Sequence, residues 1–480
     1  MPVENKHPLD RIFHPASVAV VGASIRDEET GWVARLIDFG YGDKGEIYPV
    51  NPNADKVHGL KSYPRVNDIP YPVEYAIFNI PARLTPQVMR DCVARGVKFV
   101  HCYAAGFSET GTEVGKRLEA EMVKIAKDGG IRVLGPNCMG IYSPDSGMTF
   151  NEDFPKEKGR IAFVSQSGAE STRLVFLAQD VNLCFSKVVS YGNACDLDSP
   201  DFLEYLAQDD ETDVIALYIE GIKNGPRFVS AIKKCMEKKP VVILKAGLTE
   251  SGAGAAASHT ASMAGVKAIW DAFFKQTGAI PALTMDEVAD IIQGLVRIIK
   301  PQGRRVAVIG RGGGIGVIAS DICERAGLKV PPFSHATQQK LLNIIPEAGA
   351  GMRNPVETMV GMGGAADFYL RGLPIVDEDP ETDIILVHMA IDVYGGHTSD
   401  LVQQVTDSAY ALCAIADSIK KPMAVALFPG GHPDTLRAVG AARDNLTKCG
   451  IPVFSGIESA SRAFSKICNY YQFFDTHKEK

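Results

Sequence analysis

The sequence lacks a long hydrophobic run and a strong excess of charge of one sign. No stretch approaches the roughly 18 uncharged apolar residues of a membrane-spanning helix, so we expect no membrane span. The N-terminus MPVENKHPLDRIF is polar and has no apolar core, which argues against a secretion signal. A net charge of −7 argues against nucleic acid as the main partner. We therefore place the protein in the cytoplasm.

The sequence also has no C-x-x-C motif, although it contains ten cysteines. Their scattered spacing argues against a zinc site, and we identify no other metal ligands. In a long chain without a secretion signal, such cysteines are typical of reduced thiols that pack as small core residues. We expect free thiols and no metal in this chain.

What is present is a repeated pattern of a short apolar run, a glycine-containing turn and an amphipathic helical stretch. It starts at Ser17–Gly22 and restarts at Arg160–Ser165 and at Arg304–Gly310. Strands that alternate with helices predict parallel sheets covered on both faces. The other expected strands are Glu46–Val50, Tyr75–Ile80, Phe99–Cys102, Arg132–Gly135, Phe185–Ser190, Val214–Ile219, Pro240–Lys245, Asp383–Met389, Pro422–Leu427 and Ile451–Phe454. We predict an α/β fold of three consecutive Rossmann-like or flavodoxin-like units, at 1–150, 151–300 and 301–480.

The turn after the first expected strand, Val-Val-Gly-Ala-Ser at 20–24, is the first candidate site. A glycine directly after a buried strand lets a ligand approach the backbone, and the following helix start favours an anion. The turn is not a complete G-x-G-x-x-G, and the second strand ends in Asn51, where a NAD site usually has Asp or Glu. A nicotinamide-dependent dehydrogenase is therefore disfavoured, and a tight turn without a ligand stays an alternative.

A second candidate is Ser165-Gln166-Ser167-Gly168, again between a strand and a helix. Two hydroxyls and a glycine at a helix start can cap the helix and hold an anion together. Gly168 is not followed by Lys-Ser/Thr, so the segment is not a P-loop. A plain capped helix is the alternative.

A third candidate is His259, between Ser258 and Thr260 in a segment of small and polar residues, Gly247–Ser262, for which we predict a loop. An imidazole can act as a base, a ligand or a nucleophile near neutral pH. It needs an orienting acid, and Glu220 directly follows an expected strand, where the ends of parallel strands face the functional edge of the sheet.

A fourth candidate is the glycine-rich turn Gly310–Gly316. Its glycines do not fit the spacing of a dinucleotide loop. We interpret it as a loop for close approach of an unknown ligand, with Arg311 as a residue that could meet a phosphate.

Taken in order, these segments resemble one family. They are VVGAS (20–24), IYPVNPN (47–53), AGF (105–107), RVLGPNCMGI (132–141), VSQSGA (164–169), GN-ACDLDSPDFLEYL (192–206), VIALYIEGI (214–222), KPVVILKAG (239–247) and SHTASMAG (258–265). The order is similar to that of the α, CoA-binding part of the NDP-forming acyl-CoA synthetases, the superfamily of succinyl-CoA synthetase and ADP-forming acetyl-CoA synthetase. The resemblance is dense over about residues 10–300 and looser beyond.

The resemblance implies an enzyme that interconverts a small carboxylic acid, CoA and NTP with acyl-CoA, NDP and phosphate. His259 matches the histidine that carries the phosphoryl group, and Glu220 matches the acid that orients it. Ser165, Gln166, Ser167 and Gly168 match a phosphate-holding helix start. The resemblance also implies coenzyme A contacts from Ala23, Ser24, Arg26, Asn51, Asn53, Ile80, Pro81, Ala82, Gly106 and Asn137.

No ATP-grasp segment, which binds nucleotide and Mg²⁺ in this family, is recognisable in the sequence. The resemblance therefore implies a separate ATP-grasp β subunit that supplies ATP/ADP and Mg²⁺, in a hetero-oligomer such as α2β2. A non-catalytic CoA-binding regulatory subunit is the alternative, although a sensor needs neither His259 nor Glu220. The acid, the choice of ADP or GDP and the direction of the reaction stay open.

Overall fold

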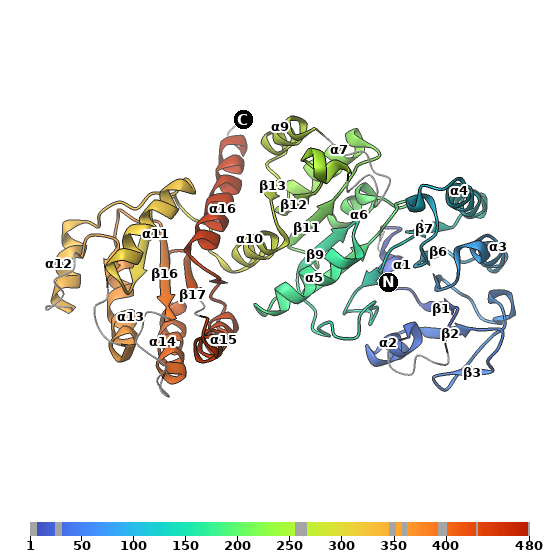
Figure 1. The fold of residues 1–480 in the computed structure, drawn as a ribbon, viewed down its shortest axis with the longest axis horizontal. Coiled ribbons are helices and arrows are strands. Elements are labelled where there is room, and N and C mark those ends of the chain that lie inside the picture. The colour runs from blue at the N-terminus through green and yellow to red at the C-terminus, as the bar shows by residue number, and fades with distance from the viewer. Residues whose placement is uncertain are drawn as a thin grey trace, which may run out of the picture. The chain divides into compact units, whose positions relative to one another are not determined.

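The chain folds into two compact units, shown in Figure 1. The computed structural model describes residues 7–24, 31–254, 266–344, 352–357, 362–391, 401–428 and 431–478. One unit comprises residues 1–179 and 184–288, and the other comprises 180–183 and 289–480. In the described residues the first unit contains two large sheets and the second contains one. The α/β class with mostly parallel sheets is confirmed, whereas the division into three domains stays a prediction.

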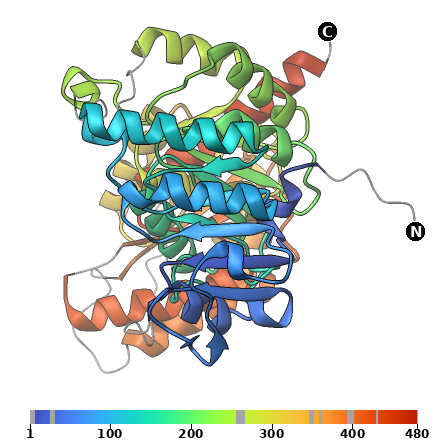
Figure 2. The ribbon, with the colours of Figure 1, turned by 90° about the vertical axis from the view of Figure 1, so that its right-hand side faces the viewer.

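The first sheet has the order β2-β1-β5-β6-β7, and all its strands are parallel. Its strands are β1 (Ser17–Val21), β2 (Glu46–Val50), β5 (Tyr75–Phe78), β6 (Phe99–Cys102) and β7 (Arg132–Leu134). The accompanying elements are the helices α1 (Asp10–Phe13), α2 (Trp32–Asp38), α3 (Thr85–Arg95) and α4 (Glu113–Asp128), and the short pair β3 (Lys56–Val57) and β4 (Leu60–Lys61). Helices α3 and α4 lie side by side (Figure 2), and their apolar residues Met89 and Met122 are fully buried against the sheet.

The second sheet has the order β13-β12-β11-β9-β10-β8, with β8 as its antiparallel edge strand. Its strands are β8 (Gly140–Tyr142), β9 (Ile161–Ser165), β10 (Phe185–Ser190), β11 (Val214–Ile219), β12 (Val241–Lys245) and β13 (Ile280–Ala282). The helices are α5 (Gly168–Gln179), α6 (Ser199–Leu206), α7 (Gly225–Met236), α9 (Lys267–Thr277) and α10 (Met285–Arg297). Residues 250–254 are helical, so the loop predicted from Gly247 is wrong there. Thr249 caps this helical turn, because its Oγ1 accepts from Gly252 N at 3.1 Å.

The third sheet, in the second unit, has the order β15-β14-β16-β17-β18 and is parallel. Its strands are β14 (Val306–Gly310), β15 (Val356–Glu357), β16 (Ile384–Ala390), β17 (Met423–Phe428) and β18 (Val453–Phe454). The helices are α11 (Gly313–Arg325), α12 (His335–Ile344), α13 (Met362–Asp377), α14 (Leu401–Ala416), α15 (Pro433–Lys448) and α16 (Ile457–Lys478). Asn354 supports β14 from beside it, because its side chain accepts from Val308 N at 2.9 Å and donates to Val306 O at 2.9 Å.

One pair of cysteines corrects the expectation of free thiols. Cys413 in α14 and Cys449 at the end of α15 form a disulfide, with their Cα atoms 5.7 Å apart. The other eight cysteines are free. Sequence spacing does not reveal the pair, because the two residues meet only through the packing of α14 against α15.

The described helices include none whose length and apolar character would let it cross a bilayer.

Candidate functional site

The carboxyl edge of the first sheet gathers the residues predicted to contact coenzyme A. Pairing of Val21 with both Val50 and Phe78 puts the ends of β1, β2 and β5 level with one another. Ala23 and Ser24 follow β1, Asn51 and Asn53 follow β2, Ile80, Pro81 and Ala82 follow β5, Gly106 follows β6, and Asn137 follows β7. Arg26 lies outside the described residues. The sequence therefore identified one continuous edge, and contact of these residues with coenzyme A stays a prediction.

Gly22 is the first residue after β1 at this edge, and no larger residue fits there. Its φ is +86°, and an added Cβ would lie 2.2 Å from the carbonyl oxygen of Asn79. The N–H groups of Gly22 and Ala23 both donate to Val50 O, at 3.0 and 3.3 Å. The turns after β1, β2 and β5 are thus packed backbone against backbone.

Asn51 joins two of the predicted ligand loops through its amide group. Its Nδ2 donates to Ala23 O at 2.7 Å, and its Oδ1 accepts from Asn53 N at 2.8 Å. Donating and accepting at once requires an amide, since an ionised carboxylate only accepts. The absence of Asp or Glu at this position, noted in the sequence, therefore has a structural reason.

Glu109 holds the turn at Gly106 in place. Its Oε1 accepts from Gly106 N at 2.6 Å and from Phe107 N at 3.1 Å, and its Oε2 accepts from Asn193 Nδ2 at 2.6 Å. Burial by itself would raise the pKa of Glu109, but the hydrogen bonds from Asn193, Gly106 and Phe107 lower it below its usual value. The loop predicted to contact coenzyme A is thus held by a carboxylate that stays ionised at neutral pH.

The predicted phosphate segment forms a buried turn between β9 and α5, which begins at Gly168 as expected. Ser167 Oγ accepts from Glu170 N at 3.3 Å, and Ser165 Oγ accepts from Ser167 N at 3.1 Å. Ser167 therefore caps the helix, and Ser165 shapes the turn before it. The first N–H groups of α5 give this end of the helix a partial positive charge.

Gln166 connects this turn to the predicted acid. Glu220 follows β11, which pairs with β9, and is 3% exposed. The side-chain oxygen of Gln166 accepts the backbone N–H of Glu220 and that of Gly221, the second at 2.9 Å. The structure thus brings together the predicted phosphate residues and the predicted orienting acid. His259 lies outside the described residues, so its role stays a prediction.

Lys245, at the end of β12, is a neighbour of Glu220 that sequence reasoning missed. Its Nζ donates to Glu220 O at 2.7 Å and also to Ala246 O, and it lies 5.5 Å from the centre of the Trp270 ring. Burial lowers its pKa to about 8, although the charge of Glu220 opposes that shift. Its place at a strand end, within the motif KPVVILKAG, was the available signal.

Tyr218, two residues before Glu220 on β11, is a second neighbour of this acid that was missed. Burial, the negative charge of Glu220 and a hydrogen bond with its carboxylate raise the pKa of the Tyr218 phenol above its usual value. The phenol therefore stays protonated and can donate to the carboxylate.

A cavity of about 360 Å³ lies between the carboxyl edge of the first sheet and the start of α5. Its lining residues are Tyr103, Ala104, Ala105, Asn137, Cys138, Met139, Gln166, Ser167, Gly168 and Ala169. A predicted coenzyme A residue, Asn137, therefore faces the same space as the start of α5. This arrangement has room for the thiol end of coenzyme A and a phosphate group close together.

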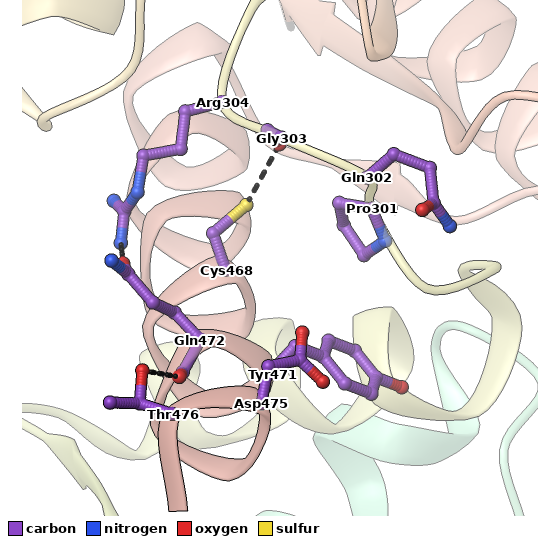
Figure 3. A pocket seen from close by; sticks show the side chains of 9 residues that line it. All are labelled: Pro301, Gln302, Gly303, Arg304, Cys468, Tyr471, Gln472, Asp475 and Thr476. Carbon is purple, nitrogen blue, oxygen red and sulfur yellow. Dashed lines mark hydrogen bonds between the residues drawn. The ribbon is translucent and has the colours of Figure 1, made fainter. Parts of the chain in front are cut away.

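A larger cavity of about 500 Å³ lies elsewhere, between the segment Pro301–Arg304 and α16 (Figure 3). None of the predicted site residues lines it. Cys468, whose Sγ donates to Gly303 O, is buried there, and burial raises the pKa of its thiol to about 11. A protonated thiol is a poor nucleophile, so we assign no chemistry to this cavity.

In the second unit, the loop predicted over Gly310–Gly316 is shorter than expected, because Gly310 ends β14 and the residues from Gly313 on are helical. Gly312 has a φ of +103°, and α11 begins at Gly313. Gly310 packs on the ring of His388, which an added Cβ would approach to 2.2 Å. The role of Arg311 toward a phosphate stays a prediction.

Comparisons with known proteins identify the family. Residues 16–144 match the CoA binding domain, and residues 158–295 match the succinyl-CoA ligase like flavodoxin domain. The chain is 38% identical over 458 residues to the acetate–CoA ligase [ADP-forming] II subunit alpha of Pyrococcus furiosus, covering 95% of this chain and 96% of that one. It is 36% identical over 466 residues to the acetate–CoA ligase [ADP-forming] I of Archaeoglobus fulgidus, covering 96% of this chain but 64% of that protein.

A solved structure agrees. The dinucleotide forming acetyl-coenzyme A synthetase 1 of Ca. Korarchaeum cryptofilum, in complex with phosphate and ADP, is 33% identical and superposes with a TM-score of 0.83 over 98% of each chain. The family expected from the motifs is thereby confirmed. The chain belongs to the NDP-forming acyl-CoA synthetases, as an acid–thiol ligase of the alpha-subunit type.

Proposed function

We propose that this subunit carries both the coenzyme A site and the phosphoryl-carrying histidine of its enzyme. One observation supports this most strongly: Gln166 lines the cavity that Asn137 also lines, and its side chain holds the backbone of Glu220. The thiol end of coenzyme A, the phosphate and the acid that orients the histidine thus fall in one place. Residues 1–150 form the coenzyme A domain, 151–300 the domain with the histidine segment, and 301–480 a second ligase domain.

Coenzyme A fits the carboxyl edge of the first sheet. The tight turn at Gly22 and the positive φ of Gly106, +110°, expose backbone at the edge. Nearby side chains from Ser24, Asn51 and Asn53 offer hydrogen bonds. Coenzyme A would cross this edge with its thiol toward Asn137 and the cavity.

In the phosphoryl steps, His259 accepts the phosphoryl group from the nucleotide on one ring nitrogen. Glu220 accepts the N–H of the other ring nitrogen, which fixes the tautomer and stabilises the charge on the ring. The phosphoryl group then passes to the carboxylate of the acid, forming an acyl phosphate. The sulfur of coenzyme A attacks the acyl carbon, the bond to the phosphate oxygen breaks, and inorganic phosphate leaves. The turn Ser165–Gly168 leads into α5 and holds the phosphate throughout, because the N-terminal end of a helix carries a partial positive charge.

The nucleotide comes from a partner in this proposal. The chain matches 96% of a relative named as an alpha subunit, but 64% of a single-chain relative. The remaining third of that relative would correspond to an ATP-grasp β subunit, which binds ATP/ADP and Mg²⁺ in a cytoplasmic hetero-oligomer such as α2β2. Because the relatives are named for acetate, a short carboxylic acid is the first substrate to test.

The reverse reaction tests the proposal. The chain and its ATP-grasp partner would be co-purified and supplied with acetyl-CoA, ADP, Mg²⁺ and phosphate, and ATP formation would be followed with luciferase. We expect ATP only when both subunits are present, and a loss of at least about 100-fold in Glu220→Gln with unchanged coenzyme A affinity by calorimetry. Coenzyme A binding without turnover, across a panel of acyl-CoA thioesters and with GDP as well as ADP, would instead identify a non-catalytic CoA-binding regulatory subunit.

A further inference from the structure

Asn193, in the turn after β10, lies between the two parts of the proposed site. The residue is 6% exposed, and its Nδ2 donates to Glu109 Oε2 at 2.6 Å and to Glu119 Oε2 at 3.1 Å. Two carboxylates therefore converge on one amide nitrogen. Glu109 in turn holds the N–H groups of Gly106 and Phe107, so the amide of Asn193 supports the predicted coenzyme A loop.

The backbone of the same turn is held by Lys223. Lys223 Nζ donates to Asn193 O at 3.1 Å and to Ala194 O at 2.7 Å. Lys223 is three residues beyond Glu220, in the loop whose beginning is fixed by Gln166. One short turn thus connects the Glu220 loop with the Gly106 loop.

Close backbone packing makes this connection stiff. An added Cβ on Gly192 would lie 2.3 Å from Asn137 O, so the turn packs directly on the predicted coenzyme A residue Asn137. Asn193 N donates to Pro136 O at 3.0 Å, and Cys195 N donates to Gly135 O at 2.9 Å. A displacement of the 135–137 segment would therefore move Asn193 as well.

We propose that Asn193 is a positioning residue that couples the coenzyme A loop to the loop of Glu220. The inference rests on the proposed function, because it takes Gly106 and Glu220 as parts of the two sites. Binding of coenzyme A and phosphorylation of His259 then bias the same network of hydrogen bonds, and each changes the free energy of the other by the same amount. A contiguous set of packed and hydrogen-bonded groups is the physical basis for such coupling.

Calorimetry measures the coupling directly. The affinity of the complex for coenzyme A would be determined before and after phosphorylation of the chain by ATP and Mg²⁺, without the acid, so that no thioester forms. In the wild type we expect the two dissociation constants to differ by about tenfold, a typical size for coupling between sites. In Asn193→Ala the ratio should fall to near one. The control Asn151→Ala removes a partly buried asparagine whose side chain accepts from the neighbouring Asp153 N, and it should keep the wild-type ratio.

Two further variants keep the test decisive if Asn193→Ala does not fold. Lys223→Met breaks the other arm of the connection, and Glu109→Gln weakens the hydrogen bond from Asn193 while keeping an acceptor for Gly106. Both should reduce the ratio. Coupling is contradicted if a folded Asn193→Ala, or both of these variants, keeps the wild-type ratio, or if the wild-type ratio is one. A wild-type complex that binds no coenzyme A, or takes up no phosphoryl group, would contradict the proposed function instead.

Discussion

The side chain of Gln166 accepts the backbone N–H of Glu220, which joins two strand ends 54 residues apart in the sequence. A second hydrogen bond, from Gly221 N, ends on the same oxygen at 2.9 Å. Both N–H groups are buried, and an unpaired buried donor costs about 1–3 kcal/mol. The amide of Gln166 therefore fixes where Glu220 lies relative to the start of α5.

Replacing this amide should separate phosphoryl transfer from coenzyme A binding. Gln166→Leu leaves both N–H groups without an acceptor, and we expect phosphorylation of the chain to slow by at least about tenfold, since displacing a positioned group by 1 Å can cost on the order of 100-fold. Affinity for coenzyme A should change little. Phosphorylation kinetics and calorimetry are the two measurements. The control Gln208→Leu removes an exposed glutamine whose side chain donates to Glu204 O, and equal slowing in both variants would contradict the role of Gln166.

The turn at Gly22 offers a second test with a matched glycine. Gly22 and Gly59 both have positive φ, +86° and +79°, but only an added Cβ at Gly22 meets a neighbour, Asn79 O, while Gly59 has open space. Gly59→Ala should cost only the backbone strain of about 1–2 kcal/mol. Gly22→Ala should destabilise more, because the turn must also move, and should weaken coenzyme A binding. Thermal unfolding and calorimetry would show this, and equal effects of the two changes would argue against the close approach.

The lowered pKa of Lys245 should make the stability of the folded chain depend on pH. Its pKa in the folded chain is about 8, below the ordinary value of 10.5, so the unfolded state binds more protons between these pH values. The contribution of Lys245 to the free energy of unfolding should therefore rise as the pH increases from 8 to 10.5. We expect Lys245→Met, which keeps an apolar stem beside Trp270, to lack this rise.

Urea unfolding across that pH range measures the effect for the wild type, Lys245→Met and the control Lys275→Met, which replaces an exposed lysine on α9. The control should follow the wild type. A rise of equal size in wild type and Lys245→Met would show that Lys245 does not titrate as expected.

The disulfide between Cys413 and Cys449 should stabilise the second unit. It closes a loop of 36 residues, which corresponds to about 3–4 kcal/mol in the chain-entropy account. We expect Cys413→Ser with Cys449→Ser to lower the denaturation midpoint of that unit. Alkylation of the unfolded, unreduced chain should label eight of its ten cysteines. Labelling of all ten would contradict the pairing.

The sequence was most informative for residues whose place in the fold follows from the end of a single strand. Glu220 was predicted because it follows an apolar run, and it does follow β11, whereas its bond to Gln166 was not predicted. Residues that act through side-chain geometry were not foreseen. Asn193 and Lys245 both stand in the recognised motifs, but a motif does not tell which side chains bond to which loops. The partners of both residues come from segments distant in sequence, such as Glu109 for Asn193.

Five short strands (β3, β4, β8, β13 and β15) and the disulfide were missed because they depend on tertiary packing. The edge strand β8 has three residues, Gly140–Tyr142, and pairs antiparallel with β10, so its short apolar run is not distinguishable from a loop. The Cys413–Cys449 bond depends on two helices lying side by side. Periodicity predicts which elements form, whereas pairing at an edge depends on tertiary packing.

Transfer of label from γ-³²P-ATP to the chain tests the central claim most directly. The chain would be incubated with its ATP-grasp partner and Mg²⁺, and compared with the chain alone, with His259→Ala and with the control His58→Ala, which changes a half-buried histidine in the turn between β3 and β4. We predict acid-labile, base-stable label that requires the partner, is lost in His259→Ala and persists in His58→Ala. Undiminished label in His259→Ala, or no label in a complex that forms ATP from acyl-CoA, would contradict it.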